Sequence, residues 1–235
     1  PYNQPMIFFS SDNLIGKISQ FNKSINLHKK YLNDSNIFIF GIKPISPSPE
    51  YGYFITKKIS NNLNKVDRFI EKPNKNKARI IVKKKGYMNS GMFFVRKDSI
   101  IKSFKKHQHK IFEHCNDAVT RSKLYKNIYY LNKASFEKLR EISFDYAILE
   151  KSKNIYGIKL SIPLTDLGNW KEIWKFFKNH KSRSNIKKNT FYRPWGKYIN
   201  LFSGKGFLLK ELLINPKSSI SLQKHTYRSE RWTII

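Results

Sequence analysis

The sequence predicts an α/β fold over residues 1–178, in which helices flank a mostly parallel sheet, followed by a small all-β unit from Tyr192. The first observation is a strand–helix–strand pattern in the segment 66–95, where two apolar runs enclose a basic helical segment. The second is that polar residues stand at the ends of these runs, where α/β proteins bind ligands. The third is that short alternating runs, joined by Gly and Pro turns, follow Tyr192.

Two strands and a helix are predicted before this central pattern. Met6–Ser10 is a short apolar run that predicts a buried strand, and Asp12 follows its carboxyl end. Apolar residues then recur at helical spacing over residues 15–25, which predicts a helix with Asp12 or Asn13 near its cap. Ile37–Gly41 predicts the next buried strand.

The segment 51–95, which includes the central pattern, contains the phrases that look placed for chemistry. Tyr51–Tyr53 begins a strand, and its Gly52 indicates a close approach of the backbone to another group. Phe69–Pro73 (FIEKP) is an apolar run that ends in an acid, a base and a proline. Lys75–Lys85 predicts a short basic helix, and Tyr87–Val95 (YMNSGMFFV) places an Asn-Ser-Gly step before a buried-type strand.

Four helices, a strand and a tight turn are predicted after the centre. The first three helices are Ser99–His107, Lys110–Lys123 and Ser143–Lys151, the last of these with Ser143 or Asp145 as its cap. Ile155–Leu160 predicts a strand, and Thr165–Trp170 (TDLGNW) predicts a turn that carries an acid, before an aromatic helix through Phe177. The polar segment 179–191 predicts a linker between domains at 1–178 and 192–235.

The charge of the chain admits two interpretations. Lys and Arg number 46 against 16 Asp and Glu, which gives a net charge of +30 and favours binding to nucleic acid or another polyanion. The lysines are spread along the chain without a nucleic-acid-binding motif, however, so we prefer compositional bias and do not expect a nucleic-acid partner. The single cysteine, Cys115, excludes a disulfide framework and favours a reducing, cytoplasmic location. Neither an apolar run of about 18 residues nor a secretory signal is present, so no membrane partner is expected.

The chain resembles the bifunctional bacterial mannose-1-phosphate guanylyltransferases, in which a nucleotidyltransferase (nucleotide-diphospho-sugar transferase) domain precedes a cupin mannose-6-phosphate isomerase domain. The matching phrases occur in the family's order: SSDN, GIKP…YGYF, FIEKP, YMNSGMF, FDYAILEK, TDLGNW, RPWGKY and SISLQKHTYRSERW. The resemblance implies a Rossmann-like α/β domain followed by the start of a cupin. It also implies transfer from GTP to mannose-1-phosphate, giving GDP-mannose and pyrophosphate for surface polysaccharide synthesis.

The resemblance implies roles for six residues of the transferase part. Asp12 and Asp166 match the family's acids for Mg²⁺, although from the residues alone the first reads as a helix cap and the second as a turn acid. Lys72 matches a catalytic, phosphate-holding lysine. Glu71 and Asn89 match sugar-hydroxyl contacts, with Gly52 allowing backbone approach. The alternatives are a surface ion pair for Glu71 with Lys72, a turn residue for Asn89 and a bulge for Gly52.

The chain also departs from the family. None of its ten glycines forms the Gly-rich loop that wraps the nucleotide triphosphate, so we expect a fragment whose activity by itself is impaired. In the cupin part, Gln223, His225 and Glu230 match metal ligands, but Tyr227 replaces a second histidine, so a stable metal site is not expected there. The alternatives to an enzyme are a non-catalytic remnant and a basic nucleic-acid-binding module. A homo-oligomer is compatible with the sequence.

Overall fold

A computed structural model of the chain describes residues 4–168, 173, 189–220 and 229–234. The chain divides into two compact units. The first contains Pro1–Ser11 and Ile15–Leu164, and the second contains Asp12–Leu14 and Thr165–Ile235. No helix among the described residues is both long enough and apolar enough to cross a membrane.

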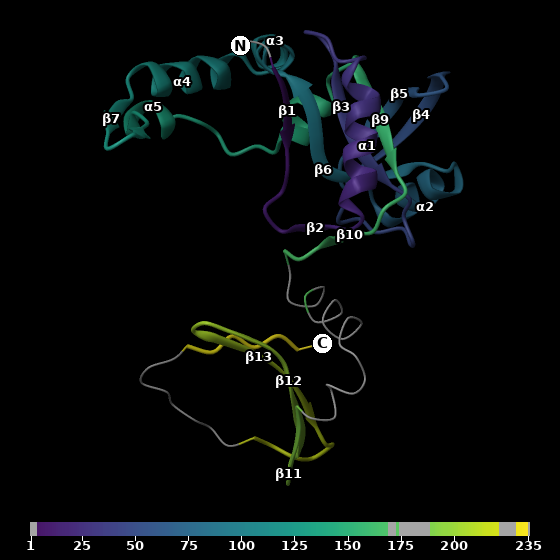
Figure 1. Ribbon diagram of the computed structural model, residues 1–235, viewed down its shortest axis with the longest axis vertical. Helices are drawn as coiled ribbons and strands as arrows, with labels where there is room; N and C mark the ends of the chain where they lie inside the picture. Colours follow the sequence, from purple (N-terminus) through teal and green to yellow (C-terminus); the bar gives the residue numbers. More distant parts are fainter. Residues whose placement is uncertain (1–3, 169–172, 174–188, 221–228, 235) are drawn as a thin grey trace. The chain divides into compact units, whose positions relative to one another are not determined.

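The first unit is built on a six-stranded sheet with the order β1-β6-β3-β9-β5-β4 (Figure 1). Its strands are β1 (Pro5–Phe8), β3 (Ile37–Ile42), β4 (Tyr53–Ser60), β5 (Leu63–Ile70), β6 (Tyr87–Arg96) and β9 (Ile155–Leu160). The β3–β9 pair is parallel, whereas β1–β6, β3–β6, β4–β5, β4–β6 and β5–β9 are antiparallel. The expected α/β class is therefore confirmed, but the expectation of a mostly parallel sheet is wrong.

The chain's connections explain the strand directions. Only two residues separate β4 from β5, and such a short link joins antiparallel strands. The helix α2 (Lys75–Lys83) joins β5 to β6, and these two strands run the same way, as a crossover requires. The oppositely directed pair β3 and β9 lies between them, so almost every neighbouring pair is antiparallel. The local pattern shows the crossover but not which strands it encloses.

The central strand β3 is buried on both faces, which accounts for its uninterrupted apolar run. Phe38 and Phe40 belong to one core cluster with Phe21 of α1 (Ile18–Lys29), and Figure 1 shows α1 lying along this part of the sheet. Ile37 and Ile39 belong to a second cluster on the opposite side of the strand, as the two-residue period demands.

Several predicted elements differ in their bounds or kind. β1 is a half-buried edge strand rather than a buried one, because β6 is its one partner in the described sheet. Asp12 and Asn13 do not cap α1, because the short strand β2 (Asn13–Ile15) pairs with β10 (Leu164–Asp166) and the helix starts later, after Lys17. The expected helix Ser143–Lys151 is a single π turn, η1 (Asp145–Leu149).

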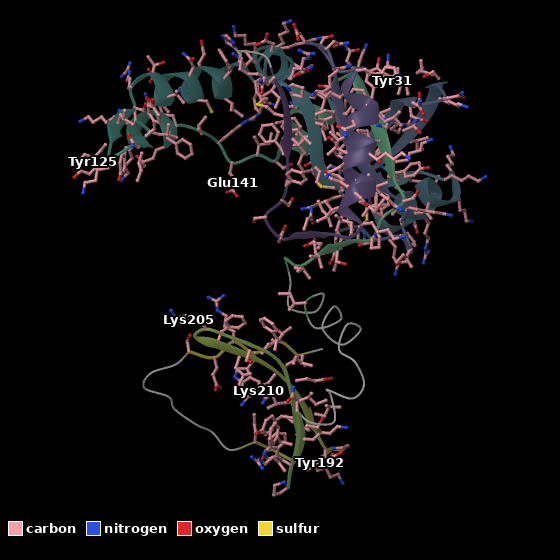
Figure 2. All side chains as sticks on the ribbon, viewed as in Figure 1. Tyr31, Tyr125, Glu141, Tyr192, Lys205 and Lys210 are labelled. Carbon is pink, nitrogen blue, oxygen red and sulfur yellow. The ribbon has the colours of Figure 1, made fainter. Side chains whose placement is uncertain are left out.

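The remaining helices of the first unit are α3 (Lys97–His107), α4 (His109–Thr120) and α5 (Lys133–Phe136). The hairpin of β7 (Lys123–Tyr125) and β8 (Ile128–Tyr130) follows α4 and was predicted partly as helix. Figure 1 shows α4, α5 and β7 extending away from the sheet, and Figure 2 shows Tyr125 in this extension.

The second unit confirms the expected change to β structure. Three antiparallel strands, β11 (Thr190–Arg193), β12 (Gly196–Gly204) and β13 (Phe207–Ile214), form one sheet in sequence order. The predicted aromatic helix through Phe177 and most of the predicted linker lie outside the described residues.

Candidate functional site

Glu71, Lys72 and Asn89 are brought to the neighbourhood of Gly52 by the ends of three strands. β5 ends at Ile70, and Lys72 then adopts a left-handed backbone (φ 40°) before the buried Pro73. This turn leaves Glu71 half-buried and Lys72 exposed at the junction between strand and helix.

Gly52 is the point at which these residues meet. The backbone N–H of Asn89 donates to the carbonyl of Gly52 at 2.8 Å, which extends the pairing of β6 with β4. A Cβ on Gly52 would collide with Oε2 of Glu71, so the carboxylate lies directly against this glycine. The predicted close approach at Gly52 therefore involves Glu71 itself. Asn89 lies near the amino end of β6 rather than at a carboxyl end of a strand.

Asp145 of η1 and Glu150, which directly follows η1, complete this cluster, and neither was predicted as a site residue. Oδ1 of Asp145 accepts a hydrogen bond from Nδ2 of Asn89 at 2.8 Å. Oε1 of Glu150 accepts one from the backbone N–H of Glu71 at 2.9 Å. The sequence offered one signal, the phrase FDYAILEK, but its acids were interpreted as helix residues.

The cluster contains three carboxyl groups, and the charges of Asp145 and Glu150 disfavour the ionised form of Glu71. Burial raises the pKa of Glu71 to about 7, with Asp145 and Glu150 adding to the effect and Lys72 opposing it. Burial likewise raises the pKa of Asp145, while its hydrogen bond from Asn89 and the charge of Lys72 oppose this. Perturbed carboxyl groups beside a lysine and a buried amide are typical of a site that binds a polar ligand.

Asp12 and Asp166 form a second site, within the second unit. Oδ2 of Asp12 lies 2.6 Å and Oδ1 of Asp166 lies 2.9 Å from the position that a Cβ on Gly168 would occupy. The backbone N–H of Leu167 donates to the carbonyl of Asp12 at 2.8 Å, and that of Gly168 donates to Oδ1 of Asp166 at 2.7 Å. The two carboxylates therefore converge on a space that exists because residue 168 has no side chain.

These two carboxylates suit a divalent cation that substrate oxygens complete. Mg²⁺ is commonly held by one or two carboxylates plus phosphates and water, and Asp12 and Asp166 supply the carboxylate share. Among the described residues, no Lys or Arg lies within ion-pair distance of either carboxylate, and no group of three metal-ligand side chains occurs. The residues present thus fit a cation that arrives with its substrate rather than a closed structural metal site.

The predicted sites divide between the units. Asp12 and Asp166 belong to the second unit, and Gly52, Glu71, Lys72 and Asn89 belong to the first. That all six line one cleft stays a prediction. The cupin candidates Gln223 and His225, with Tyr227, lie outside the described residues, and Glu230 is exposed.

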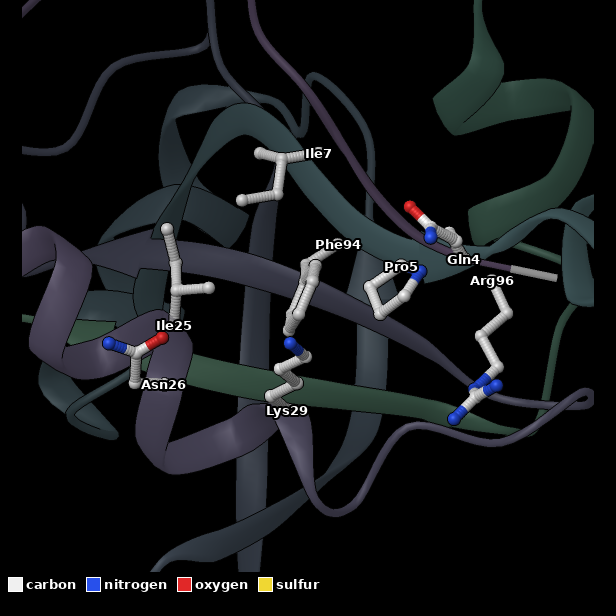
Figure 3. A pocket seen from close by; sticks show the side chains of 8 residues that line it. All are labelled: Gln4, Pro5, Ile7, Ile25, Asn26, Lys29, Phe94 and Arg96. Atoms are coloured by element: carbon white, nitrogen blue, oxygen red, sulfur yellow. The ribbon is translucent and has the colours of Figure 1, made fainter. Parts of the chain in front are cut away.

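A shallow pocket of about 540 Å³ in the first unit contains none of the predicted site residues (Figure 3). It lies beside α1, β1 and β6, with an apolar wall of Ile7, Ile25 and Phe94. Lys29 and Arg96 stand among its polar lining residues. The predicted chemistry therefore lies elsewhere in the chain.

Two protein families together match residues 2–235 of the chain. The family described as nucleotidyl transferase matches residues 2–183, which is most of the chain. The family described as mannose-6-phosphate isomerase C-terminal matches residues 179–235.

Characterised bacterial relatives align over almost the entire chain. The alginate biosynthesis protein AlgA of Pseudomonas aeruginosa is 24% identical over 98% of this chain and 62% of its own length. Proteins named mannose-1-phosphate guanylyltransferase are 23% identical in Salmonella muenchen and 22% identical in Escherichia coli. They align over 98% and 100% of this chain, and over 63% and 64% of their own lengths. The chain thus spans less than two thirds of these relatives.

Solved structures share the fold. A protein from Thermus thermophilus titled mannose-1-phosphate geranyltransferase has a TM-score of 0.65 and 20% identity, over 76% of this chain and 50% of that one. A mannose-6-phosphate isomerase from Helicobacter pylori has a TM-score of 0.63 and 27% identity, over 71% of this chain and 65% of that one.

Proposed function

The chain belongs to the nucleotidyl transferase family, and we propose that it takes part in the transfer of a guanylyl group from GTP to mannose-1-phosphate. The relatives named mannose-1-phosphate guanylyltransferase support the choice of substrates. The observation that carries the proposal is the convergence of Asp12 and Asp166 on the open space at Gly168. A pair of carboxylates that no Lys or Arg among the described residues neutralises suits a metal-dependent phosphoryl reaction.

The reaction exchanges one bond at phosphorus for another. A phosphate oxygen of mannose-1-phosphate attacks the α-phosphorus of GTP, and the bond from that phosphorus to the oxygen bridging to the β-phosphate breaks. The products are GDP-mannose and pyrophosphate. Catalysis of such a transfer consists mainly of positioning and charge neutralisation.

Asp12 and Asp166 would hold a divalent cation, and we propose Mg²⁺ because both ligands are hard oxygen donors. When bound, this cation neutralises phosphate charge and orients the triphosphate. Lys72 is exposed and supplies a positive charge for the sugar phosphate, while Glu71 and Asn89 bind sugar hydroxyl groups. Gly52 adds no side chain and so leaves room for the carboxylate of Glu71 in this position.

The proposed product places the chain in polysaccharide precursor synthesis, since relatives are named for alginate and xanthan biosynthesis. A cytoplasmic location belongs to the same proposal, because GTP is supplied there. We assign no separate reaction to β11–β13.

The test is the formation of GDP-mannose by the full chain in excess over GTP, so that even slow transfer is detected by mass spectrometry. We expect product only when GTP, mannose-1-phosphate and Mg²⁺ are all present. Replacement of GTP by ATP, CTP or UTP reports the base preference. The proposal would be overturned if no nucleoside triphosphate gave a sugar nucleotide, or if product formed equally well in the presence of EDTA.

A further inference from the structure

The π turn η1 holds both hydroxyl-binding residues of the proposed site. Its first residue, Asp145, accepts from the side chain of Asn89, and Glu150, directly after it, accepts from the backbone N–H of Glu71. These contacts join segments that are 56 and 79 residues apart in the sequence. The segment of η1 and Glu150 therefore fixes one partner on β6 and another directly after β5.

The π geometry is what allows one turn to serve both partners. The N–H of Glu150 donates to the carbonyl of Asp145 at 3.0 Å, which closes the wider i to i+5 turn. On a regular α-helix, residues five apart would face about 140° away from each other. The wider turn brings them closer to one side, so that both acids reach the sheet.

Core packing and the side chain of Gln108 hold η1 in place. Ala147, Ile148 and Leu149 are buried in the second core cluster. The buried side chain of Gln108 donates from Nε2 to the carbonyl of Ala147 at 3.1 Å, and its Oε1 accepts from Nη2 of Arg140 at 2.6 Å. Packing on one side and hydrogen bonds on the other leave η1 little freedom to shift.

The contact with Asp145 determines which end of the Asn89 amide is available. Oδ1 of Asp145 accepts the hydrogen bond, so the NH₂ group of Asn89, its donor end, faces this acid. The other end, Oδ1, is buried and has no hydrogen-bond partner among the described residues, and Asn89 as a whole is 8% exposed. A buried carbonyl oxygen without a partner is unfavourable until a donor reaches it.

We propose that Asp145 and Glu150 are positioning residues and that Asp145 makes Asn89 a pure acceptor, which selects a sugar with a hydroxyl donor at that position. The inference rests on the proposed function, because it concerns the sugar half of that site. A site with a buried acceptor strongly rejects an analogue that lacks the matching hydrogen-bond donor, because the acceptor is then left unpaired. An apolar pocket discriminates less strongly between ligands that differ only in shape. The specificity of the site therefore depends on a residue that need not touch the substrate.

The test compares mannose-1-phosphate with its monodeoxy-monofluoro analogues, in which fluorine replaces one hydroxyl at a time. Fluorine keeps much of the size of the hydroxyl group but donates no hydrogen bond. Binding to the full chain is measured by ¹⁹F NMR and by competition with unlabelled mannose-1-phosphate. For the unmodified chain we expect one analogue to bind at least tenfold more weakly, because it leaves Oδ1 of Asn89 unpaired.

Two variants separate the roles of the acids. Asp145→Asn offers Asn89 either a donor or an acceptor, so the amide of Asn89 can turn over, and the discrimination should fall to within about threefold. Glu150→Ala frees the N–H of Glu71 and should weaken mannose-1-phosphate binding while the discrimination at Asn89 persists. Asp67→Asn, on an exposed acid that pairs with Lys57 at 2.7 Å, is the control and should change neither.

The outcomes distinguish the inference from the function on which it rests. Full discrimination in a folded Asp145→Asn chain would overturn the inference and leave the proposed function standing. If Asp145→Asn does not fold, Glu150→Ala still tests the inference. Loss of discrimination between the fluoro analogues in Glu150→Ala would show that Asp145 alone does not set the acceptor at Asn89. Failure of the unmodified chain to bind mannose-1-phosphate at all would overturn the proposed function and the inference together.

Discussion

Glu71 lies directly against the backbone of Gly52, so that a side chain at position 52 and the carboxylate of Glu71 cannot both keep their places. The two residues come from the start of β4 and the end of β5, which pair through Tyr53 and Ile70. Glu71 can therefore keep its position at the end of β5 only because residue 52, before β4, has no Cβ.

Gly52→Ala should displace Glu71 and weaken the binding of mannose-1-phosphate by about tenfold, the equivalent of roughly 1.4 kcal/mol. The Cβ would also lie 3.1 Å from the ring of Phe69, which adds strain in the same place. Titration calorimetry measures the binding, and thermal unfolding shows how much of the loss is structural. Unchanged affinity in a folded variant would mean that Glu71 does not contact the sugar.

Lys72→Ala should abolish detectable binding of mannose-1-phosphate, which we expect to be in the millimolar range, about −4 kcal/mol, for the unmodified chain. The matched control is Lys85→Ala, because Lys85 is also exposed and also has a left-handed backbone (φ 57° against 40° for Lys72). Both variants lose one charge and face the same backbone strain. Equal losses in the two would show that the phosphate is attracted by the general charge of +30 rather than by Lys72.

Glu71 should make the stability of the chain fall as pH rises. Its pKa is raised from 4.5 to about 7 in the folded protein, so the folded state binds more protons than the unfolded state between these values. The stability due to neutral Glu71 is therefore fully present below about pH 4.5 and is lost as pH rises through about 7. Because the group is half-buried, solvent screening reduces the effect to on the order of 1 kcal/mol.

The variant Glu71→Gln cannot ionise and should escape this loss. Its melting temperature relative to the unmodified chain should increase by about 2–4 °C between pH 5 and pH 8. Glu137→Gln, on an exposed acid of the α5 region, controls for the general effect of removing a carboxylate. If the difference in melting temperature between Glu71→Gln and the unmodified chain stayed constant over this pH range, the raised pKa of Glu71 would be contradicted.

Phe54 should be among the most sensitive positions of the core. Its ring is packed against the backbones of Gly41 in β3 and Gly157 in β9, where Cβ atoms would lie within 2.9 and 2.7 Å of it. Phe54→Ala should destabilise the chain by about 3–5 kcal/mol, and Gly157→Ala by about 1–3 kcal/mol through overpacking. Urea unfolding measures both. Losses of unfolding free energy below 1 kcal/mol would show that the packing of Phe54 against Gly41 and Gly157 does not stabilise the sheet.

The sequence predicted the elements that depend on local pattern. The buried strands β3 and β9 and the helix α2 appear close to their expected bounds, because apolar runs and periodicity report burial directly. The strand directions were not accessible in the same way. They depend on which strands lie between β5 and β6, and no residue within that crossover encodes its neighbours.

The candidate site was likewise predicted only where local pattern marks a residue. FIEKP and YMNSG drew attention to Glu71, Lys72 and Asn89 because each phrase breaks an apolar run. Asp145 and Glu150 were not predicted as site residues because residues five apart do not lie on the same face of an α-helix. The π turn that brings them to one side arises from packing against the sheet. The role of Gly168 was likewise hidden, since it depends on the approach of Asp12 from a distant part of the chain.

The most direct test of the central claim, that Asp12 and Asp166 together hold a divalent cation, is Mn²⁺ binding followed by electron paramagnetic resonance in the presence of GTP. We expect one Mn²⁺ per chain, with an affinity that falls at least tenfold in Asp12→Asn, in Asp166→Asn and in Gly168→Ala, whose Cβ would fill the space between the carboxylates. Asp67→Asn should bind as the unmodified chain does. Equal Mn²⁺ affinity in all five proteins would contradict the account.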